Sequence, residues 1–181
     1  MTSTPRRAPS VAVIGDGELS PDDPKVALAE RLGELVVDTG WRVVSGGLGG
    51  VMEAASRGAR RATSYQPGAI IGILPGTDPA DANPYIDIAI PTGLAHARNI
   101  LVAQSDAVVA IGGGAGTMAE LAFAWIMDRL VIAFRVPGWS GLVADTRLDA
   151  RVRYPDVPDD RVFGVDTPEQ AITILQERMK L

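Results

Sequence analysis

The sequence predicts a single α/β domain built on a parallel β-sheet that carries helices on both faces. Short, continuous apolar runs alternate with segments whose apolar residues recur at helical spacing, which is typical of strands buried on both sides and joined by helical crossovers. Two of the apolar runs lead directly into glycine-rich loops. The length of 181 residues suits one domain with a full core. These observations together indicate a Rossmann-like fold.

The apolar runs define six expected strands. The first, second and fifth are strongly apolar and lead into glycine-rich segments, so we expect them side by side or near the centre of the sheet. The expected strands are Val11–Ile14, Trp41–Ser45, Ala69–Leu74, Ile86–Ile90, Ala107–Ile111 and Leu130–Phe134.

Helix signals lie between these runs. Ser20 followed by Pro21 is typical of a helix N-terminus, and Gly40 is expected to end that helix. Thr167 and Gln170 form a capping box that opens a final helix. Other expected helices cover Val51–Arg61, Ala95–Gln104 and the segment that begins near Met118.

Two parts of the chain give weaker signals. Residues 137–158 indicate a short helix followed by a polar loop that contains prolines. Residues 1–9 are expected to be a disordered tail, and 10–181 a single Rossmann-like nucleotide-binding domain without an internal repeat.

Composition excludes several classes of function. There is no cysteine and His96 is the single histidine, so disulfides, thiolate nucleophiles and metal sites built from cysteine or several histidines are excluded. The net charge of −5 argues against binding nucleic acid non-specifically. No apolar run has the length of a signal peptide or a membrane span. We therefore expect a cytoplasmic protein without a metal, a nucleic-acid partner or a membrane partner.

Two glycine-rich loops carry the chemistry. Ser45–Gly50 and Gly112–Thr117 each follow an expected strand and precede an expected helix. Glycine lets an anion approach backbone N–H groups closely, and a helix N-terminus adds a favourable dipole. One such loop alone could be only a tight connection, but two indicate a phosphate or nucleotide site. The expected ligand contacts are Gly46, Gly47, Gly49, Gly113, Gly114, Gly116 and Thr117.

Two familiar nucleotide motifs do not fit. Neither loop ends in the Gly-Lys-Ser/Thr of an ATPase P-loop. The first strand leads into Gly15-Asp16-Gly17-Glu18-Leu19-Ser20, which lacks the third glycine of the NAD fingerprint and places acids where a pyrophosphate would lie.

The segment 95–120 resembles a known family. It contains Ala97-Arg98-Asn99, then the run Asp106-Ala107-Val108-Val109-Ala110-Ile111, then Gly113-Gly114-Ala115-Gly116-Thr117-Met118-Ala119-Glu120. This pattern is similar to the signature of the Lonely Guy (LOG) family, once called lysine decarboxylases and now associated with phosphoribohydrolase activity. Gly46-Gly47-Leu48-Gly49-Gly50 looks like the first phosphate loop of that family. The resemblance covers roughly residues 11–134.

The chain also departs from that family. Gly112 stands where the signature has proline, and Asn99 stands where cytokinin-activating members have lysine. With these differences, the sequence more closely resembles a branch of the superfamily that contains molybdenum-cofactor carrier proteins and nucleotide-binding proteins related to the DNA-processing protein DprA. No lysine lies in a recognisable pyridoxal-phosphate motif, so lysine decarboxylation is not expected.

The resemblance implies roles for three polar residues. Glu120 corresponds to the carboxylate implicated in cleaving an N-glycosidic bond, and Arg98 to an arginine that pairs with a ligand phosphate or holds Glu120. Asn99 either contacts the ligand or caps its own turn. From spacing alone, Thr117 and Glu120 would instead form a capping box. His96 is expected at the surface or in an interface rather than as a catalyst.

Two functions of different classes remain open. The favoured one is a carrier-type protein that binds a phosphorylated, nucleotide-like small molecule such as the molybdenum cofactor. The alternative is an enzyme, a phosphoribohydrolase that releases a base from a nucleoside 5′-monophosphate, with Arg98 and Glu120 as catalytic residues. Whether the chain is an enzyme is not decided by the sequence. A DNA-binding module of the DprA kind is a remote third interpretation, disfavoured by the acidic charge. The resemblance implies a homodimer or homotetramer.

Overall fold

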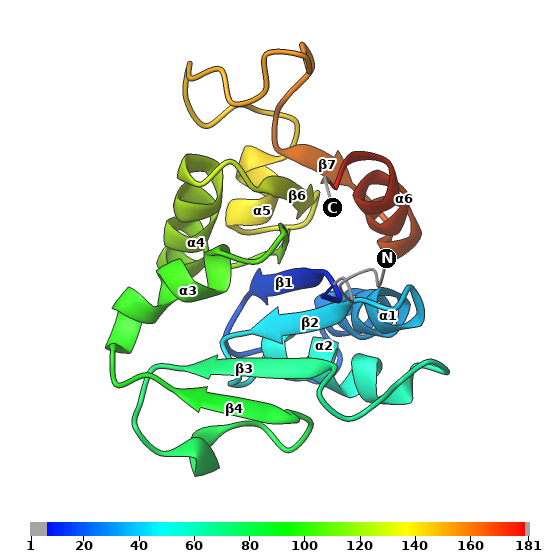
Figure 1. Cartoon of the computed structure of the whole chain (residues 1–181), viewed down its shortest axis with the longest axis vertical. Helices are drawn as coiled ribbons and strands as arrows, with labels where there is room; N and C mark the ends of the chain where they lie inside the picture. The colour runs from blue at the N-terminus through cyan, green and yellow to red at the C-terminus, as the bar shows by residue number, and fades with distance from the viewer. Residues whose placement is uncertain (1–6, 180–181) are drawn as a thin grey trace, which may run out of the picture.

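The computed structural model describes residues 7–179 and forms an α/β sandwich of three layers (Figure 1). Seven parallel strands make one sheet within this range, in the order β4-β3-β2-β1-β5-β6-β7. Residues 1–6 of the expected tail lie outside the described residues. The strands are β1 (Ser10–Gly15), β2 (Arg42–Ser45), β3 (Ile70–Leu74), β4 (Ile88–Pro91), β5 (Ala107–Ile111), β6 (Leu130–Phe134) and β7 (Phe163–Val165).

The predicted centre of the sheet is confirmed. Strand β1 pairs in parallel with β2 through Val11 and Val43, and with β5 through Val11 and Ala107. The expected bounds of β5 and β6 agree with the structure, and β4 begins two residues later than expected. The short strand β7 was not predicted, because three residues with a central Gly164 carry too little apolar pattern.

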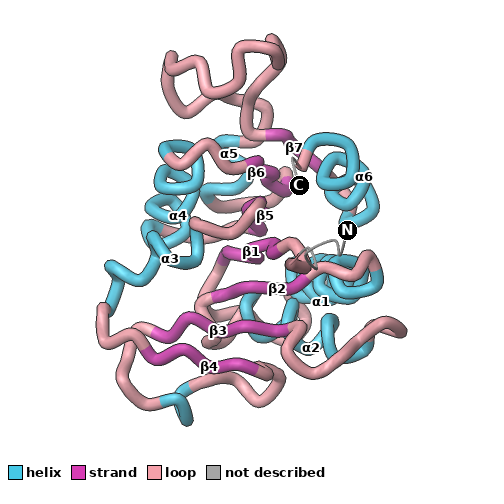
Figure 2. Tube along the Cα trace, viewed as in Figure 1, coloured by secondary structure: helices cyan, strands magenta, loops and turns pink. Residues whose placement is uncertain are grey.

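Helices cover both faces of the sheet, as the alternating pattern predicts. Figure 2 shows α1, α2 and α6 on one side of the strands and α3, α4 and α5 on the other. The helices are α1 (Pro24–Asp38), α2 (Val51–Arg61), α3 (Asn99–Ala103), α4 (Ala115–Ile126), α5 (Trp139–Val143) and α6 (Pro168–Arg178), with short 3-10 helices η1 (Pro79–Asp81) and η2 (Ala95–Arg98).

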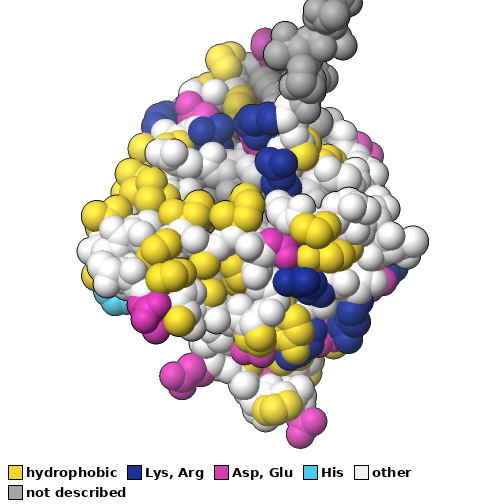
Figure 3. Space-filling model, turned by 60° about the horizontal axis from the view of Figure 1, so that its bottom comes forward, with side chains coloured by type: hydrophobic (Ala, Val, Ile, Leu, Met, Phe, Trp, Pro, Cys, Tyr) yellow, Lys and Arg dark blue, Asp and Glu magenta, His cyan; other side chains and the backbone are white. Residues whose placement is uncertain are grey.

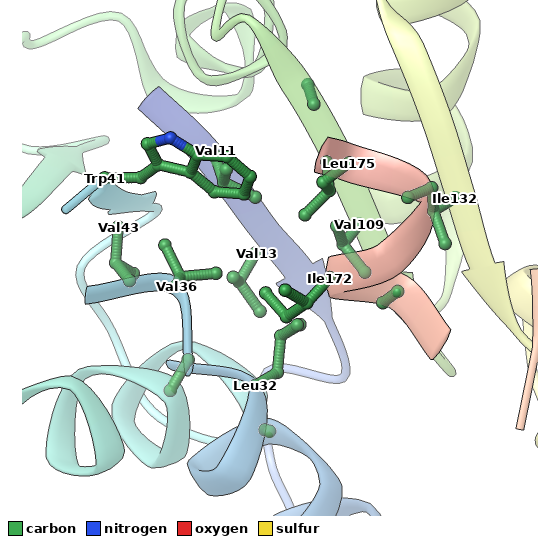
Figure 4. Close-up of a cluster of buried hydrophobic side chains, with 14 of the residues drawn as sticks. Val11, Val13, Leu32, Val36, Trp41, Val43, Val109, Ile132, Ile172 and Leu175 are labelled. Atoms are coloured by element: carbon green, nitrogen blue, oxygen red, sulfur yellow. The ribbon is translucent and has the colours of Figure 1, made fainter. Parts of the chain in front are cut away.

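Alternate residues of each central strand enter different cores. Val11 and Val13 of β1 pack with Leu32 and Leu175 in the core beneath α1, α2 and α6 (Figure 4). Ala12 and Ile14 of the same strand enter the core beneath α3, α4 and α5. This period of two in a strand covered on both faces explains why the run is continuously apolar.

Two predicted helix starts have different outcomes. Helix α1 begins at Pro24 with Asp23 as its N-cap, so the start expected at Ser20 was wrong by a few residues. Asp23 accepts a hydrogen bond from the N–H of Lys25, and Pro24 supplies the proline of the first turn. The capping box at the start of α6 is confirmed, because the side chains of Thr167 and Gln170 satisfy each other's backbone N–H groups.

Helices α1 and α2 approach each other through glycine. A Cβ atom added at Gly58 would lie 1.8 Å from the carbonyl oxygen of Glu30, and one added at Gly33 would lie 2.0 Å from that of Ala55. At each of these two contacts, the missing side chain of a glycine in one helix lets the backbone of the other helix approach closely. This contact fixes α2, whose N-terminus follows one of the glycine-rich loops.

The loop after α5 holds the far end of α4. Arg151 donates to the carbonyl oxygens of Trp125 and Ile126 at the end of that helix. The buried Arg153 pairs with Asp160 at 2.6 Å, and its guanidinium lies 3.6 Å from the centre of the Trp125 ring. Cationic side chains complement the C-terminal dipole of a helix, so this loop anchors α4 in place.

We predict that Gly58→Ala destabilises the protein. The added methyl group forces backbone against backbone, and its cost of about 1–3 kcal/mol exceeds the gain of about 1 kcal/mol in helix propensity. Urea denaturation measures the free energy of unfolding. Gly116→Ala is the matched control, because its added Cβ would have Asn99 Nδ2 at 3.8 Å as its nearest neighbour. Equal stability of the two variants would contradict the close packing of α1 on α2.

Candidate phosphate-binding site

The strand order places a crevice beside β1. The connections after β1 and β5 run to α1 and α4, which lie on opposite faces of the sheet (Figure 1). Neighbouring strands whose following helices diverge leave an opening beyond their carboxyl ends, where ligands bind in open α/β sheets. The three loops that follow β1, β2 and β5 meet at this point.

A cavity of about 270 Å³ occupies the crevice. The end of β1, the loop after β2, the segment that joins β4 to α3, and the first turns of α2 and α4 form its walls. Its lining residues are Ile14, Gly15, Gly17, Gly46, Met52, His96, Arg98, Asn99, Gly114, Gly116, Thr117 and Glu120.

The first turn of α4 presents backbone donors to the cavity. Gly114 is the N-cap, and Gly114, Ala115 and Gly116 are exposed. The first N–H groups of a helix have no partner within the helix, and the dipole places partial positive charge there. This end of α4 is therefore an environment for an anion.

Thr117 and Glu120 do not form a capping box, so the interpretation based on spacing alone was wrong. Thr117 lies three residues beyond the N-cap, and α4 has no side-chain cap. Its hydroxyl instead donates to the carbonyl oxygen of Gly15 at 3.1 Å, which ties α4 to the end of β1. Glu120 lies one turn further along α4 and lines the cavity.

Some glycines of the second loop shape the backbone and do not face the cavity. Gly112 and Gly113 have φ angles of 67° and 95°, which favour glycine. The N–H of Gly112 donates to the Ser140 hydroxyl at 2.7 Å, and the carbonyl oxygen of Gly113 accepts from the N–H of Trp139. The start of the loop is thereby fixed to α5, and the donors that remain for a ligand begin further along.

The loop after β2 also contains both a glycine that lines the cavity and glycines that do not. Gly46 lines the cavity, and a Cβ there would lie 2.4 Å from both terminal nitrogens of Arg98. Gly47 has a φ of 74°, and its N–H donates to the Ser45 hydroxyl. Gly49 faces the carbonyl oxygen of Gly17. Of these three predicted contacts, Gly46 alone lines the cavity, and it makes room for an arginine.

Arg98 and Glu120 form a buried ion pair in the wall of the cavity. Arg98 is 8% exposed and Glu120 is 7% exposed, and Arg98 Nη1 lies 3.4 Å from Glu120 Oε1. Arg98 Nε is buried without a hydrogen-bond partner among the described residues. A guanidinium has five N–H donors, so the described residues use only a small part of this group's capacity. Such a group is poised to accept a further anionic partner.

Burial shifts the protonation of both groups. Removal from water raises the pKa of Glu120 to about 7, although the charge of Arg98 pulls it down. Burial also lowers the pKa of Arg98, and the charge of Glu120 opposes this. Arginine stays protonated at neutral pH. Protonation of Glu120 therefore leaves a net positive charge on this ion pair.

The sequence suggested that the carboxylate of Asp16 would repel a bound anion, but in the structure this carboxylate is paired with a lysine. Its carboxylate accepts from Lys25 Nζ at 2.7 Å, and its carbonyl oxygen accepts from the N–H of Val51 at the start of α2. A Cβ on Gly112 would lie 2.1 Å from Asp16 Oδ2. The charge of the Asp16 side chain is thus compensated by Lys25, and Asp16 lies against the end of the loop Ser45–Gly50 and the start of the loop Gly112–Thr117.

The structure brings most of the predicted residues into one cavity. Gly47, Gly49 and Gly113 do not line it and have the backbone roles described above. The predicted residues that line it are Gly46, Arg98, Asn99, Gly114, Gly116, Thr117 and Glu120.

Five lining residues were not predicted as ligand contacts. Gly15 and Gly17 could have been found from their place after the first strand, where every neighbouring loop carries the site. Ile14 and Met52 have no distinctive signal, because both resemble core residues. His96 was expected at the surface, and it is exposed and lines the cavity as well.

A larger hollow lies at the other edge of the sheet. It has a volume of about 410 Å³ and includes Leu130 and Phe163, the first residues of β6 and β7. Ligands of open α/β sheets bind at the carboxyl ends of the strands, and the two glycine-rich loops meet at the smaller cavity, so this cavity is the candidate site.

Residues 7–179 contain neither a cluster suited to a metal ion nor a membrane-spanning helix. Within this range, no three histidine, cysteine, aspartate or glutamate side chains are placed together to hold a metal. No helix among the same residues is both long and apolar enough to cross a membrane.

The cavity and the sheet define a class of α/β protein in which glycine-rich loops at a topological switch point surround a candidate anion site. The chain belongs to the SLOG cluster4 family, whose model matches residues 8–172. This confirms the predicted branch of the LOG superfamily.

Comparisons with individual proteins agree with this family. The chain is 38% identical to an uncharacterized protein of Archaeoglobus fulgidus over 128 residues, which are 70% of this chain and 80% of that protein. The molybdenum cofactor binding protein of Rippkaea orientalis has a similar structure, with 32% identity, a TM-score of 0.78, and coverage of 96% of this chain and 99% of that one. The molybdenum cofactor carrier protein of Chlamydomonas reinhardtii shows 27% identity, a TM-score of 0.73, and coverage of 93% of this chain and 97% of that one.

We predict that Glu120 makes stability depend on pH. A carboxyl whose pKa is raised in the folded state stabilises the protein most below its ordinary pKa of 4.5, and this contribution is lost as the pH rises through about 7. Relative to Glu120→Gln, the wild type should lose on the order of 2–3 kcal/mol of unfolding free energy between pH 4.5 and 8. Urea denaturation of both proteins at several pH values measures the difference. If the difference in unfolding free energy between the two proteins did not change with pH, the pKa of Glu120 would not be raised in the folded protein.

Proposed function

We propose that this protein is a carrier-type protein that binds a phosphorylated, nucleotide-like small molecule, with the molybdenum cofactor as the candidate cargo. The observation that carries the proposal is the meeting of two anion-binding features in one cavity. The open N-terminus of α4 supplies backbone donors, and the buried Arg98 supplies a guanidinium whose Nε has no partner among the described residues. Both favour a phosphate group.

The comparisons support a carrier over other functions of the superfamily. Two similar structures, which align over nearly their whole length, are named for binding or carrying the molybdenum cofactor. That cofactor is a pterin that ends in a phosphate. The residues present fit this end of the molecule, because the cavity joins a glycine-lined helix N-terminus to an arginine. Its volume of about 270 Å³ approaches the roughly 300 Å³ at which small-molecule pockets begin.

One observation favours a second function, phosphoribohydrolase activity. Glu120 is buried beside Arg98 in the proposed phosphate site, and burial raises its pKa to about 7. A carboxyl that titrates near neutral pH suits a general acid that protonates a leaving base, or a general base that activates water. In this second function Arg98 positions the phosphate and Glu120 performs the proton transfer.

The remaining assignments follow from the same proposal. We propose the cytoplasm as the location and a small phosphorylated ligand as the partner, with neither nucleic acid nor membrane. We also propose self-association as a homodimer or homotetramer. Apolar side chains gather on one face of the surface (Figure 3), and Ile88, Ile90 and Leu94 are each more than 40% exposed. Exposed apolar patches are typical of protein interfaces.

We predict that Gly116→Val weakens phosphate binding by at least about tenfold. An added Cβ at Gly116 would have Asn99 Nδ2, at 3.8 Å, as its nearest neighbour outside its own stretch of helix, and Gly116 lines the cavity, so the valine methyl groups should occupy space at the proposed anion site. Titration calorimetry with inorganic phosphate and with GMP measures the affinity. Ala122→Val, at an exposed position further along α4, is the control and should bind as the wild type does. Unchanged affinity in Gly116→Val would place the phosphate elsewhere.

We predict that the wild type releases no free base from AMP, GMP, CMP or UMP. A carrier does not catalyse a reaction, so Glu120→Gln should have no effect on base release and should change ligand affinity little. If the protein is instead a phosphoribohydrolase, the wild type releases base and Glu120→Gln reduces turnover by about a hundredfold or more. Chromatographic detection of free base separates the two functions. Native mass spectrometry of the purified protein identifies any small molecule that accompanies it.

A further inference from the structure

His96 occupies a place in the site that neither function assigns. It is the single histidine of the chain, it is exposed, and it lines the same cavity as Arg98 and Gly116. It comes from η2, and Arg98 and Asn99 follow within three residues, so one short segment supplies three polar side chains to the cavity. The proposed function assigns Arg98 to the phosphate and gives His96 no role.

The backbone before His96 is held in an unusual conformation. Ala95 has a φ of 48° and Gly93 a φ of 64°. A positive φ is costly for alanine, and such strain persists only where neighbouring structure imposes it. Strain of this kind clusters at ligand sites.

Hydrogen bonds to the two residues that follow β3 hold this part of the backbone in place. The N–H of Ala95 donates to the carbonyl oxygen of Pro75 at 3.0 Å, and the N–H of Gly93 donates to that of Gly76 at 2.9 Å. The N–H of Ala97 closes the turn on the carbonyl oxygen of Leu94. A pinned turn therefore presents His96 at the cavity, with its side chain exposed.

The residues that line the cavity fall into two chemical sets, which suit two different parts of a ligand. The α4 N-terminus and Arg98 suit a phosphate, whereas His96 and the apolar Met52 offer a planar ring and a thioether. Histidine stacks on heterocycles and forms hydrogen bonds with their edges, and methionine sulfur packs well against aromatic rings. A phosphate needs neither of these groups.

From this we infer that His96 contacts the heterocyclic ring of the ligand and determines which ring the site accepts. The inference rests on the proposed function, because it assumes that the phosphate of the same ligand binds at α4 and Arg98. It makes the ligand a phosphate joined to a planar nitrogen heterocycle, of the purine or pterin class. Guanine and pterin share the 2-amino-4-oxopyrimidine edge, so GMP is a suitable probe.

The test compares GMP with ribose 5-phosphate, which has the phosphate and sugar without the ring. By titration calorimetry, the wild type should bind GMP about 5- to 30-fold more tightly than ribose 5-phosphate. His96→Ala should remove most of this preference and leave the affinity for ribose 5-phosphate unchanged. Gly116→Val, the matched control at the phosphate, should weaken both probes.

A second measurement uses wild-type protein alone. Because the chain has one histidine, the imidazole signals in an NMR spectrum belong to His96. They should move on addition of GMP and stay in place with ribose 5-phosphate.

The outcomes separate a failure of the proposed function from a failure of this inference alone. If neither probe binds the wild type, the proposed function fails and the role of His96 fails with it. If both probes bind with equal affinity, or if His96→Ala weakens both or neither, the phosphate site stands and the assignment of His96 is wrong.

Discussion

The pairing of β1 with both β2 and β5 is the constraint on which the rest of the molecule depends. It brings the three loops that follow these strands to one point, and α1 and α4 leave that point on opposite faces of the sheet. Asp16 then connects neighbouring segments, because its carbonyl oxygen accepts from Val51 and its carboxylate from Lys25. Thr117 ties α4 to the end of β1 in the same region. The cavity is thus a consequence of sheet order, reinforced by short local contacts.

The cavity contains a buried arginine although the whole chain is acidic. Arg98 is almost completely buried, and among the described residues its ion-pair partner is Glu120, whose pKa is raised to about 7 by its own burial. Two charges in such a place are costly unless a further partner satisfies them. A bound phosphate would compensate Arg98 directly and would favour the protonated form of Glu120. Net charge alone therefore says little about the sign of the potential at a small site.

Sequence patterns predicted the fold and the site to different depths. The central strands were predictable because a strand covered on both faces needs a continuous apolar run, whereas β7 is too short to leave a pattern. Gly46, Gly114 and Gly116 line the cavity, whereas Gly47 and Gly113 have positive φ angles and do not line it. A glycine needed for a positive φ and one needed for access to a ligand look alike in a sequence. The expectation that His96 lies at the surface agrees with its exposure, but only the fold shows that this surface belongs to the cavity.

The glycines differ in how closely other atoms surround them, and this determines at which of them a side chain can be introduced. Gly15, Gly33, Gly50 and Gly58 press against backbone carbonyl groups and leave no room for a side chain, whereas Gly17 and Gly114 have no atoms within 4 Å of an added Cβ. New side chains can therefore be introduced around the cavity mouth while the packed glycines keep the scaffold. For protein engineers, the loops that meet at β1 form a platform whose recognition can be redesigned separately from its stability.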